Sequence, residues 1–277
     1  YQEGELVLNP EYNNIELAKG TLENLYDDNF NIYIHYDTKL KLSDKDILLL
    51  KAKHSNIKTI ISKYSGQYFG MSLIDAEIEL LKTAVNDNNT YFHLMSEQCY
   101  LIVPCEKFYN YFNNTSKEHM VFEYDKEGWQ ILDIDKGLRW AGSQWWSLSN
   151  SAVKWILNTI ETTDYDTIFR DAHYKFNYGK EHRIIAADET YFTNMFKIVD
   201  NDFEFDDNKR YYDFTWPLVN WSHPHELVLS KIKQYIDEGI IGNLIARKID
   251  YKKQDCIKLL QQIKYINRYA GNIITGT

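Results

Sequence analysis

Short apolar runs alternate with longer amphipathic stretches in the N-terminal part of the chain, and this alternation constrains the fold more than any other feature. The runs "FNIYIHYD", "IKTII" and "TYFHLMS" are rich in β-branched and aromatic residues, which predicts buried strands. Apolar residues recur at helical spacing over residues 15–25, 43–54 and 72–85. Strands that alternate with helices of this length predict an α/β fold with a mostly parallel, Rossmann-like sheet and helices on its faces.

The expected ends of these elements indicate where a ligand would bind. Ser43 and Ser72 are expected to cap the second and third helices, because a serine hydroxyl can accept a hydrogen bond from a first-turn amide. Ligands of parallel sheets lie outside the carboxyl ends of the strands. The segments of interest are therefore residues 35–37, 62–65 and 96–99.

The second half of the chain is less regular. "MVFEYD" and "WQILDID" predict antiparallel strands, and helices are expected from Ser149, from Asp188 as N-cap, over residues 226–239 and over 255–271. The acidic run at residues 200–209 predicts a solvated loop. The opening "YQEGELVLN" contains no recognisable strand, and no linker or repeat divides the chain, which predicts one domain over residues 1–277.

Charge and composition exclude several classes of function. The net charge is −9 and no dense Lys/Arg cluster forms a stripe, so duplex nucleic acid is not an expected partner. The three cysteines, Cys99, Cys105 and Cys256, lack metal-ligand spacing, which argues against a disulfide framework and a zinc site and for a reducing compartment. No apolar run reaches the roughly 18–20 residues of a membrane span. These observations predict a cytoplasmic protein, with attachment to a membrane periphery or to a larger protein as alternatives.

Common catalytic motifs are absent, and the remaining candidates are polar residues at the ends of elements. The sequence has no GxxxxGK[ST], GxGxxG, GxSxG or HExxH. His35 and Asp37 follow a strand, and Trp145 and Trp146 follow a turn at Ser143. Taken alone, each of these residues is better explained by a purely structural role, as a buried side chain or a turn residue.

Charged pairs form the second group of candidates. Asp188 and Glu189 stand at the expected start of a helix, whose dipole favours both negative charges. Arg247 and Lys248 are adjacent, and Arg210 lies upstream in "NKRYYDF". The alternative for the cations is a set of paired surface charges.

Seven segments together resemble one known family. "IYIHYD", "YFGMSLIDAEIELL", "YFHLMSEQCY", "GSQWWSLS", "ADETYF", "SHPHEL" and "IARKID" occur in the order and approximate spacing of glycosyltransferase family 14, which contains the core-2/I-branching N-acetylglucosaminyltransferases and peptide O-xylosyltransferases. The resemblance spans roughly residues 30–250.

The resemblance implies a fold and a reaction. Members of that family have a GT-A fold with a nucleotide-binding half, here about residues 1–105, an acceptor half, about 106–277, and a C-terminal helical region. They transfer a sugar from a UDP donor to an acceptor hydroxyl with inversion and without a metal cofactor. The implied partners are a UDP-sugar, with GlcNAc or xylose as the expected sugar, and a glycan or glycoconjugate acceptor.

The resemblance also assigns roles to residues. Glu189 matches the glutamate that acts as general base, and Arg247, Lys248 and, more loosely, Arg210 match the cations that neutralise the diphosphate. His35 and Asp37 match the family positions at the edge of the sheet where the nucleotide binds. Gly70 and Ser72 match the turn after the second strand. Ser143, Trp145, Trp146 and Asp188 match positions near the sugar and the acceptor.

One departure from the family pattern concerns the segment "SEQCYLI". Cys99 stands where the family has an aspartate, which puts the donor contact or structural contact of that aspartate in doubt. Two alternatives therefore accompany the transferase interpretation. One is a glucuronosyl- or other hexosyltransferase of the same fold, and the other is a carbohydrate-binding relative without turnover.

Overall fold

The chain forms two compact units, each assembled from separate segments of sequence. The computed structural model describes residues 4–8, 15–124, 136–178, 185–212, 230, 243–247, 255 and 258. The first unit comprises Tyr1–Glu11, Asn31–Leu94 and Ser116–Asn208, and the second comprises Tyr12–Phe30, Met95–Thr115 and Lys209–Thr277. The division into functional halves near residue 105 stays a prediction.

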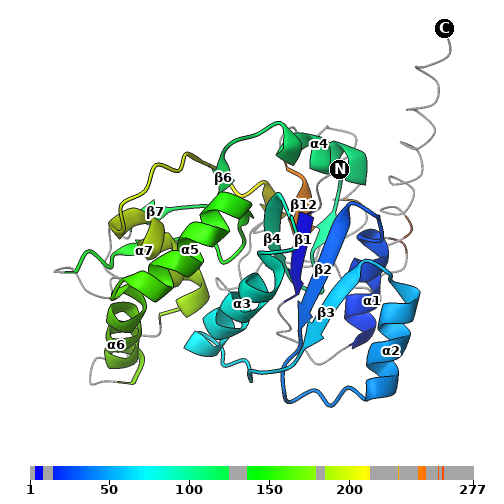
Figure 1. Cartoon of the computed structure of the whole chain (residues 1–277), viewed down its shortest axis with the longest axis horizontal. Coiled ribbons are helices and arrows are strands. Elements are labelled where there is room, and N and C mark those ends of the chain that lie inside the picture. The colour runs from blue at the N-terminus through cyan, green and yellow to red at the C-terminus, as the bar shows by residue number, and fades with distance from the viewer. Residues whose placement is uncertain are drawn as a thin grey trace, which may run out of the picture. The chain divides into compact units, whose positions relative to one another are not determined.

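A seven-stranded sheet is the centre of the first unit, with strand order β10-β6-β9-β4-β1-β2-β3 (Figure 1). β2 and β3 pair in parallel, as do β10 and β6, whereas β9 runs antiparallel to both β4 and β6. The strands are β1 Gly4–Leu8, β2 Phe30–His35, β3 Ile57–Ile61, β4 Tyr91–Met95, β6 Glu118–His119, β9 Ser147–Ser149 and β10 Phe205–Asp206. A separate pair, β7 Glu123–Tyr124 and β8 Trp140–Ala141, is antiparallel.

Within its described residues, the first unit contains five helices. They are α2 Asp44–Lys53, α3 Met71–Ala84, α5 Asn150–Thr162, α6 Tyr165–Tyr178 and α7 Ala187–Ile198. α3 packs against α5 and α7, and α6 also contacts α5 and α7. The predicted cap at Ser43 and the predicted helix start at Ser149 are confirmed: each hydroxyl accepts a hydrogen bond from an amide in the first turn of its helix.

Three sequence predictions about this unit are wrong. Ser72 does not cap α3; Gly70 is the N-cap, and the Ser72 Oγ accepts a hydrogen bond from the Gln67 amide at 2.9 Å, which stabilises the preceding turn. The opening segment does contain a strand, β1, and it lies between β4 and β2. The acidic run includes β10, because its Phe205 packs edge-on against Phe196 and Phe122 and so anchors the segment to the sheet.

The second unit contains a three-stranded sheet of order β11-β12-β5, together with α1 and α4. Its elements are α1 Ile15–Asn24, β5 Tyr100–Leu101, α4 Cys105–Asn113, β11 Arg210–Tyr212 and β12 Ile245–Arg247. The Asn24 side chain joins α1 to β5, since its oxygen accepts from the Leu101 amide at 2.8 Å and its nitrogen donates to the Leu101 carbonyl at 3.3 Å. This unit therefore brings strands from distant parts of the chain together.

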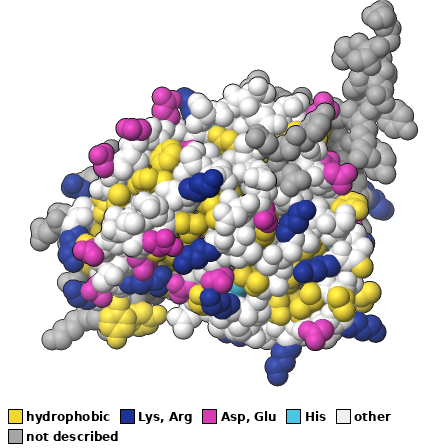
Figure 2. Space-filling view, viewed as in Figure 1, with side chains coloured by type: hydrophobic (Ala, Val, Ile, Leu, Met, Phe, Trp, Pro, Cys, Tyr) yellow, Lys and Arg dark blue, Asp and Glu magenta, His cyan; other side chains and the backbone are white. Residues whose placement is uncertain are grey.

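The α/β fold class is confirmed by a sheet with parallel pairs and by the helices that pack around it. The expected strand "WQILDID", the segment "SHPHEL" and the expected helices over 226–239 and 255–271 lie outside the described residues. On the face seen in Figure 2, acidic and basic side chains are interspersed. In the part of the chain that the structure describes, every helix is too short or too polar to cross a bilayer.

Candidate active site

The first turn of α7 carries the two adjacent acids. From Ala187 to Phe196 every residue of this helix is buried except Glu189, whose side chain keeps partial exposure. The prediction that Asp188 caps the helix is wrong: the N-cap position is Ala186, and Asp188 is a first-turn residue that is only 7 % exposed. Two first-turn amides have backbone acceptors instead: the Ala187 amide donates to the carbonyl of Phe69 and the Glu189 amide to the carbonyl of Ala186, both at 3.3 Å.

Gly142 fixes the segment next to this turn. Its amide donates to the Glu189 carbonyl at 2.9 Å, so the chain between β8 and β9 lies directly against the start of α7. A Cβ atom at this position would stand 1.9 Å from the Val121 carbonyl oxygen and 2.8 Å from Thr193 Cγ2. Glycine is therefore required here by the close approach of two backbones.

The two tryptophans that follow Gly142 lie in the core. Trp145 is 4 % exposed and Trp146 is fully buried, with its ring packed edge-on against Phe192 of α7 at 5.9 Å. The Ser143 hydroxyl accepts a hydrogen bond from the Trp145 amide at 3.2 Å, which fixes the turn that leads to them. This burial favours the core interpretation of the rings, and their contact with a sugar stays a prediction.

A third carboxyl group, Glu77 of α3, lies near the start of α7. It is 2 % exposed, and burial together with the neighbouring Asp188 charge raises its pKa well above the usual range, while a polar contact with Trp146 opposes the shift. The protonated form of Glu77 is therefore favoured compared with an exposed glutamate. Three acidic residues belong to this region, and Glu189 is the one of them that is partly exposed.

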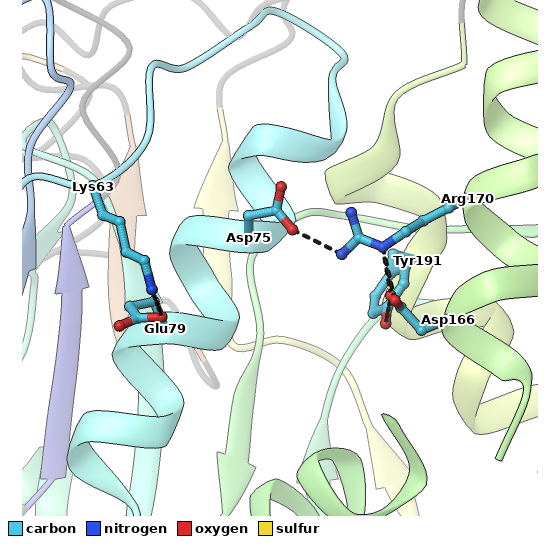
Figure 3. Close-up of polar contacts among 6 residues, drawn as sticks. All are labelled: Lys63, Asp75, Glu79, Asp166, Arg170 and Tyr191. Atoms are coloured by element: carbon cyan, nitrogen blue, oxygen red, sulfur yellow. Dashed lines mark hydrogen bonds and ion pairs between the residues drawn. The ribbon is translucent and has the colours of Figure 1, made fainter. Parts of the chain in front are cut away.

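Contacts from α6 hold α7 in place (Figure 3). Arg170 donates from Nη2 to Asp75 of α3 at 2.7 Å and from Nε to Asp166 at 2.8 Å. Asp166 in turn accepts a hydrogen bond from the Tyr191 hydroxyl of α7 at 2.7 Å. These charge-assisted contacts link α3, α6 and α7. The contact on α7 is made by Tyr191, two residues after Glu189.

The backbone before α7 is fixed by His173. Its Nε2 lies 3.1 Å from the carbonyl oxygens of both Phe69 and Ile185. Phe69 has φ 62°, a left-handed conformation that is strained for a non-glycine residue. His173 and Ala187 both contact the Phe69 carbonyl, and these contacts stabilise the strained turn.

His35 and Asp37, at the carboxyl end of β2, organise the loop after β3. The His35 Nε2 accepts hydrogen bonds from the amides of Lys63 at 3.3 Å and Tyr64 at 3.1 Å, so the ring proton is on Nδ1. Burial lowers the pKa of His35, although the Asp37 and Glu79 charges oppose that shift, and the ring is neutral. The Asp37 carboxylate accepts from the Gly66 amide at 2.9 Å. Their nucleotide contacts stay predictions.

Arg210 and Arg247 lie in the second unit, on neighbouring strands. Arg247 pairs with Tyr212 in the register of β12 and β11, and Arg210 is two positions before Tyr212. Since side chains alternate along a strand, the two arginines project from the same face of the sheet. They are 6 % and 5 % exposed, respectively. Lys248 lies outside the described residues.

Cys99, which replaces the aspartate of the family pattern, is fully buried in a tight turn of the second unit. Its sulfur accepts from the Ser96 amide at 3.3 Å, and its own amide donates to the Ser96 carbonyl at 3.0 Å. The described residues contain no group of three or more His, Cys, Asp or Glu side chains arranged to hold a metal ion.

Comparison with known protein families identifies the family of this chain. A model of the Branch family, described as core-2/I-branching enzyme, matches residues 10–236. The chain belongs to this family. The core-2/I-branching match includes every candidate site residue from His35 to Arg210, whereas Arg247 and Lys248 lie C-terminal to it.

Similarity of this family member to individual proteins is low. No curated protein matches the chain. Among solved structures it is similar to the apo-form glycosyltransferase GlyE of Streptococcus pneumoniae TIGR4, with 10% identity, a TM-score of 0.48, and coverage of 95% of this chain and 60% of that chain. A second GlyE structure gives 8% identity, a TM-score of 0.47, and coverage of 95% and 61%. The chain thus spans less than two thirds of the length of these structures.

Proposed function

We propose that this chain is an inverting glycosyltransferase that moves a sugar from a UDP donor to an acceptor hydroxyl without a metal ion, with Glu189 as general base. GlcNAc and xylose are the sugars that the family assignment favours, and the acceptor is a glycan or glycoconjugate. The absence of a metal step is carried over from the family resemblance.

The exposure of Glu189 is the observation that carries this proposal. A helix that is otherwise buried through its first ten residues leaves one carboxylate in contact with solvent, at the positive end of its dipole. An acceptor hydroxyl is a poor nucleophile until a carboxylate within hydrogen-bond reach removes its proton. A single base on one face of the sugar suits direct displacement better than the two-carboxylate retaining scheme known from glycoside hydrolases.

The arginines supply the second requirement, a counter-charge for the leaving diphosphate. Arg210 and Arg247 project from one face of the small sheet, and both are removed from bulk water. Guanidinium groups suit phosphate oxygens because their donors form a planar fork, and fixed cations can stabilise developing charge as a metal would. Lys248, adjacent to Arg247 in sequence, would add a point charge.

A donor panel in the presence of EDTA tests the proposed function. UDP release should be measured with UDP-GlcNAc, UDP-xylose, UDP-glucose and UDP-glucuronic acid, each with an oligosaccharide acceptor mixture. Turnover that persists in chelator supports the proposal, and strict dependence on Mn²⁺ or Mg²⁺ would refute the metal-free step. A protein that binds glycan but neither binds UDP nor releases it would instead be the non-catalytic carbohydrate-binding relative.

Arg247→Met is expected to raise the dissociation constant for UDP by about 10- to 100-fold, because a charge-assisted hydrogen bond is lost while an apolar chain of similar length fills the space. Isothermal titration calorimetry with UDP measures this change. Lys82→Met, which removes an exposed cation from α3, is the matched control and should bind as the wild type does. Equal affinity in the two variants would contradict the assignment of Arg247.

A further inference from the structure

The Arg247 side chain ends in a buried polar turn of the second unit. Its Nη1 donates to the Ser96 hydroxyl at 2.6 Å, and the two residues are 5 % and 2 % exposed. This contact spans distant parts of the sequence, from the loop after β4 to β12. A short hydrogen bond in a region without bulk water restricts the guanidinium to few orientations.

The hydrogen bonds of Ser96 determine how its hydroxyl is oriented. A serine oxygen has two acceptor positions and one proton. One acceptor position receives the Arg247 proton, and the other receives the Gln98 amide at 3.3 Å. The hydroxyl proton is then left to point toward Cys99 Sγ, which lies 3.5 Å away.

Cys99 completes the turn as a hydrogen-bond acceptor. Its sulfur receives the Ser96 amide at 3.3 Å in addition to the Ser96 hydroxyl, and the Cys99 amide closes the turn on the Ser96 carbonyl at 3.0 Å. The Glu97 carbonyl within the same turn is held by the Thr21 hydroxyl of α1 at 2.6 Å. A carboxylate at position 99 would accept the same hydrogen bonds but would add a negative charge close to the arginine.

We propose that Ser96 is a positioning residue for Arg247, and that Cys99 keeps the Ser96 hydroxyl in its accepting orientation. The proposal rests on the proposed function, in that the ligand of Arg247 is taken to be the diphosphate of UDP. A guanidinium stays charged at ordinary pH, and a hydrogen bond to a hydroxyl orients it without neutralising it.

Calorimetric titration with UDP tests the effect on the site. Ser96→Ala is expected to weaken UDP binding about ten-fold, since the arginine loses its orienting acceptor, and Ser96→Thr should restore affinity because it retains the hydroxyl. Cys99→Ser retains an acceptor and should bind as the wild type does, whereas Cys99→Ala should lose about two- to three-fold, as expected for a weak sulfur hydrogen bond. Cys105→Ala changes the other described free thiol of this unit and is the matched control.

A readout independent of ligand binding separates this proposal from the proposed function. In ¹⁵N NMR spectra, the Arg247 guanidinium signals, assigned by their loss in Arg247→Met, should exchange slowly with water in the wild type and rapidly in Ser96→Ala. If the wild type fails to bind UDP, the proposed function fails, while the NMR comparison still decides the role of Ser96. Unchanged guanidinium exchange in a folded Ser96→Ala variant, or unchanged UDP affinity where the wild type binds, would overturn the positioning role.

Discussion

Glu189→Gln is expected to lower kcat for sugar transfer by about 10²- to 10⁴-fold, the usual contribution of a positioned general base. The amide has the same size as the carboxylate but cannot accept the proton of the acceptor hydroxyl. UDP affinity should be unchanged, since the substitution leaves the proposed diphosphate cations intact. The fold should also persist, because Glu189 is the one residue between Ala187 and Phe196 that α7 does not bury.

Initial rates and UDP calorimetry on the same preparations measure both parts of this expectation. Glu161→Gln on the exposed side of α5 is the control for the loss of one negative charge. Retention of more than about a tenth of wild-type kcat would exclude Glu189 as the base, since even a weak general base contributes more than this.

Gly142→Ala is expected to be the most destabilising single-methyl change among the described glycines. The added Cβ would approach the Val121 carbonyl oxygen to 1.9 Å and the Thr193 Cγ2 of α7 to 2.8 Å, so the chain after β8 must move away from both. Overpacking of this severity costs about 3 kcal/mol or more of unfolding free energy. The kcat of the variant that remains folded should also fall, because the Gly142 amide donates to the carbonyl of Glu189. Small displacements of a catalytic group can cost about 100-fold in rate.

Urea denaturation followed by tryptophan fluorescence, with activity of the folded fraction, separates these two effects. Gly66→Ala is the matched comparison, because its Cβ would meet side chains alone, the Asp37 Oδ2 at 3.2 Å and the Leu73 Cδ2 at 3.7 Å. Its loss of stability should be much smaller. If the two alanine variants unfold at the same urea concentration, the close backbone contact at Gly142 does not constrain the site as described.

Elements that depend on local periodicity could be predicted from the sequence, whereas their ends depended on contacts across the fold. The strands at residues 30–35, 57–61 and 91–95 and the caps at Ser43 and Ser149 follow from local patterns. The local pattern also favours Asp188 as a cap. In the structure the N-cap is Ala186, two residues earlier, and the Phe69 carbonyl, remote in sequence, accepts from the Ala187 amide.

Side chains that support the candidate site are harder to predict from the sequence than the proposed catalytic and diphosphate-binding residues. Glu189 and Arg247 can be named because they belong to the segments "ADETYF" and "IARKID", which resemble the family pattern. Arg170, His173 and Glu77 gave no signal, since an arginine, a histidine or a glutamate on an amphipathic helix is ordinary until its tertiary partners are known. The burial of Trp145 and Trp146 likewise depends on how α7 packs, which no local pattern encodes.

The arrangement of the second unit has a consequence for how the protein is made. Its strand β12 pairs with β5, and the Arg247 guanidinium reaches Ser96, although the whole of α5, α6 and α7 intervenes in the sequence. Such pairings close long loops and form slowly. During synthesis the unit cannot be completed until residue 247 has left the ribosome, so the proposed diphosphate site should be among the last parts of the molecule to form.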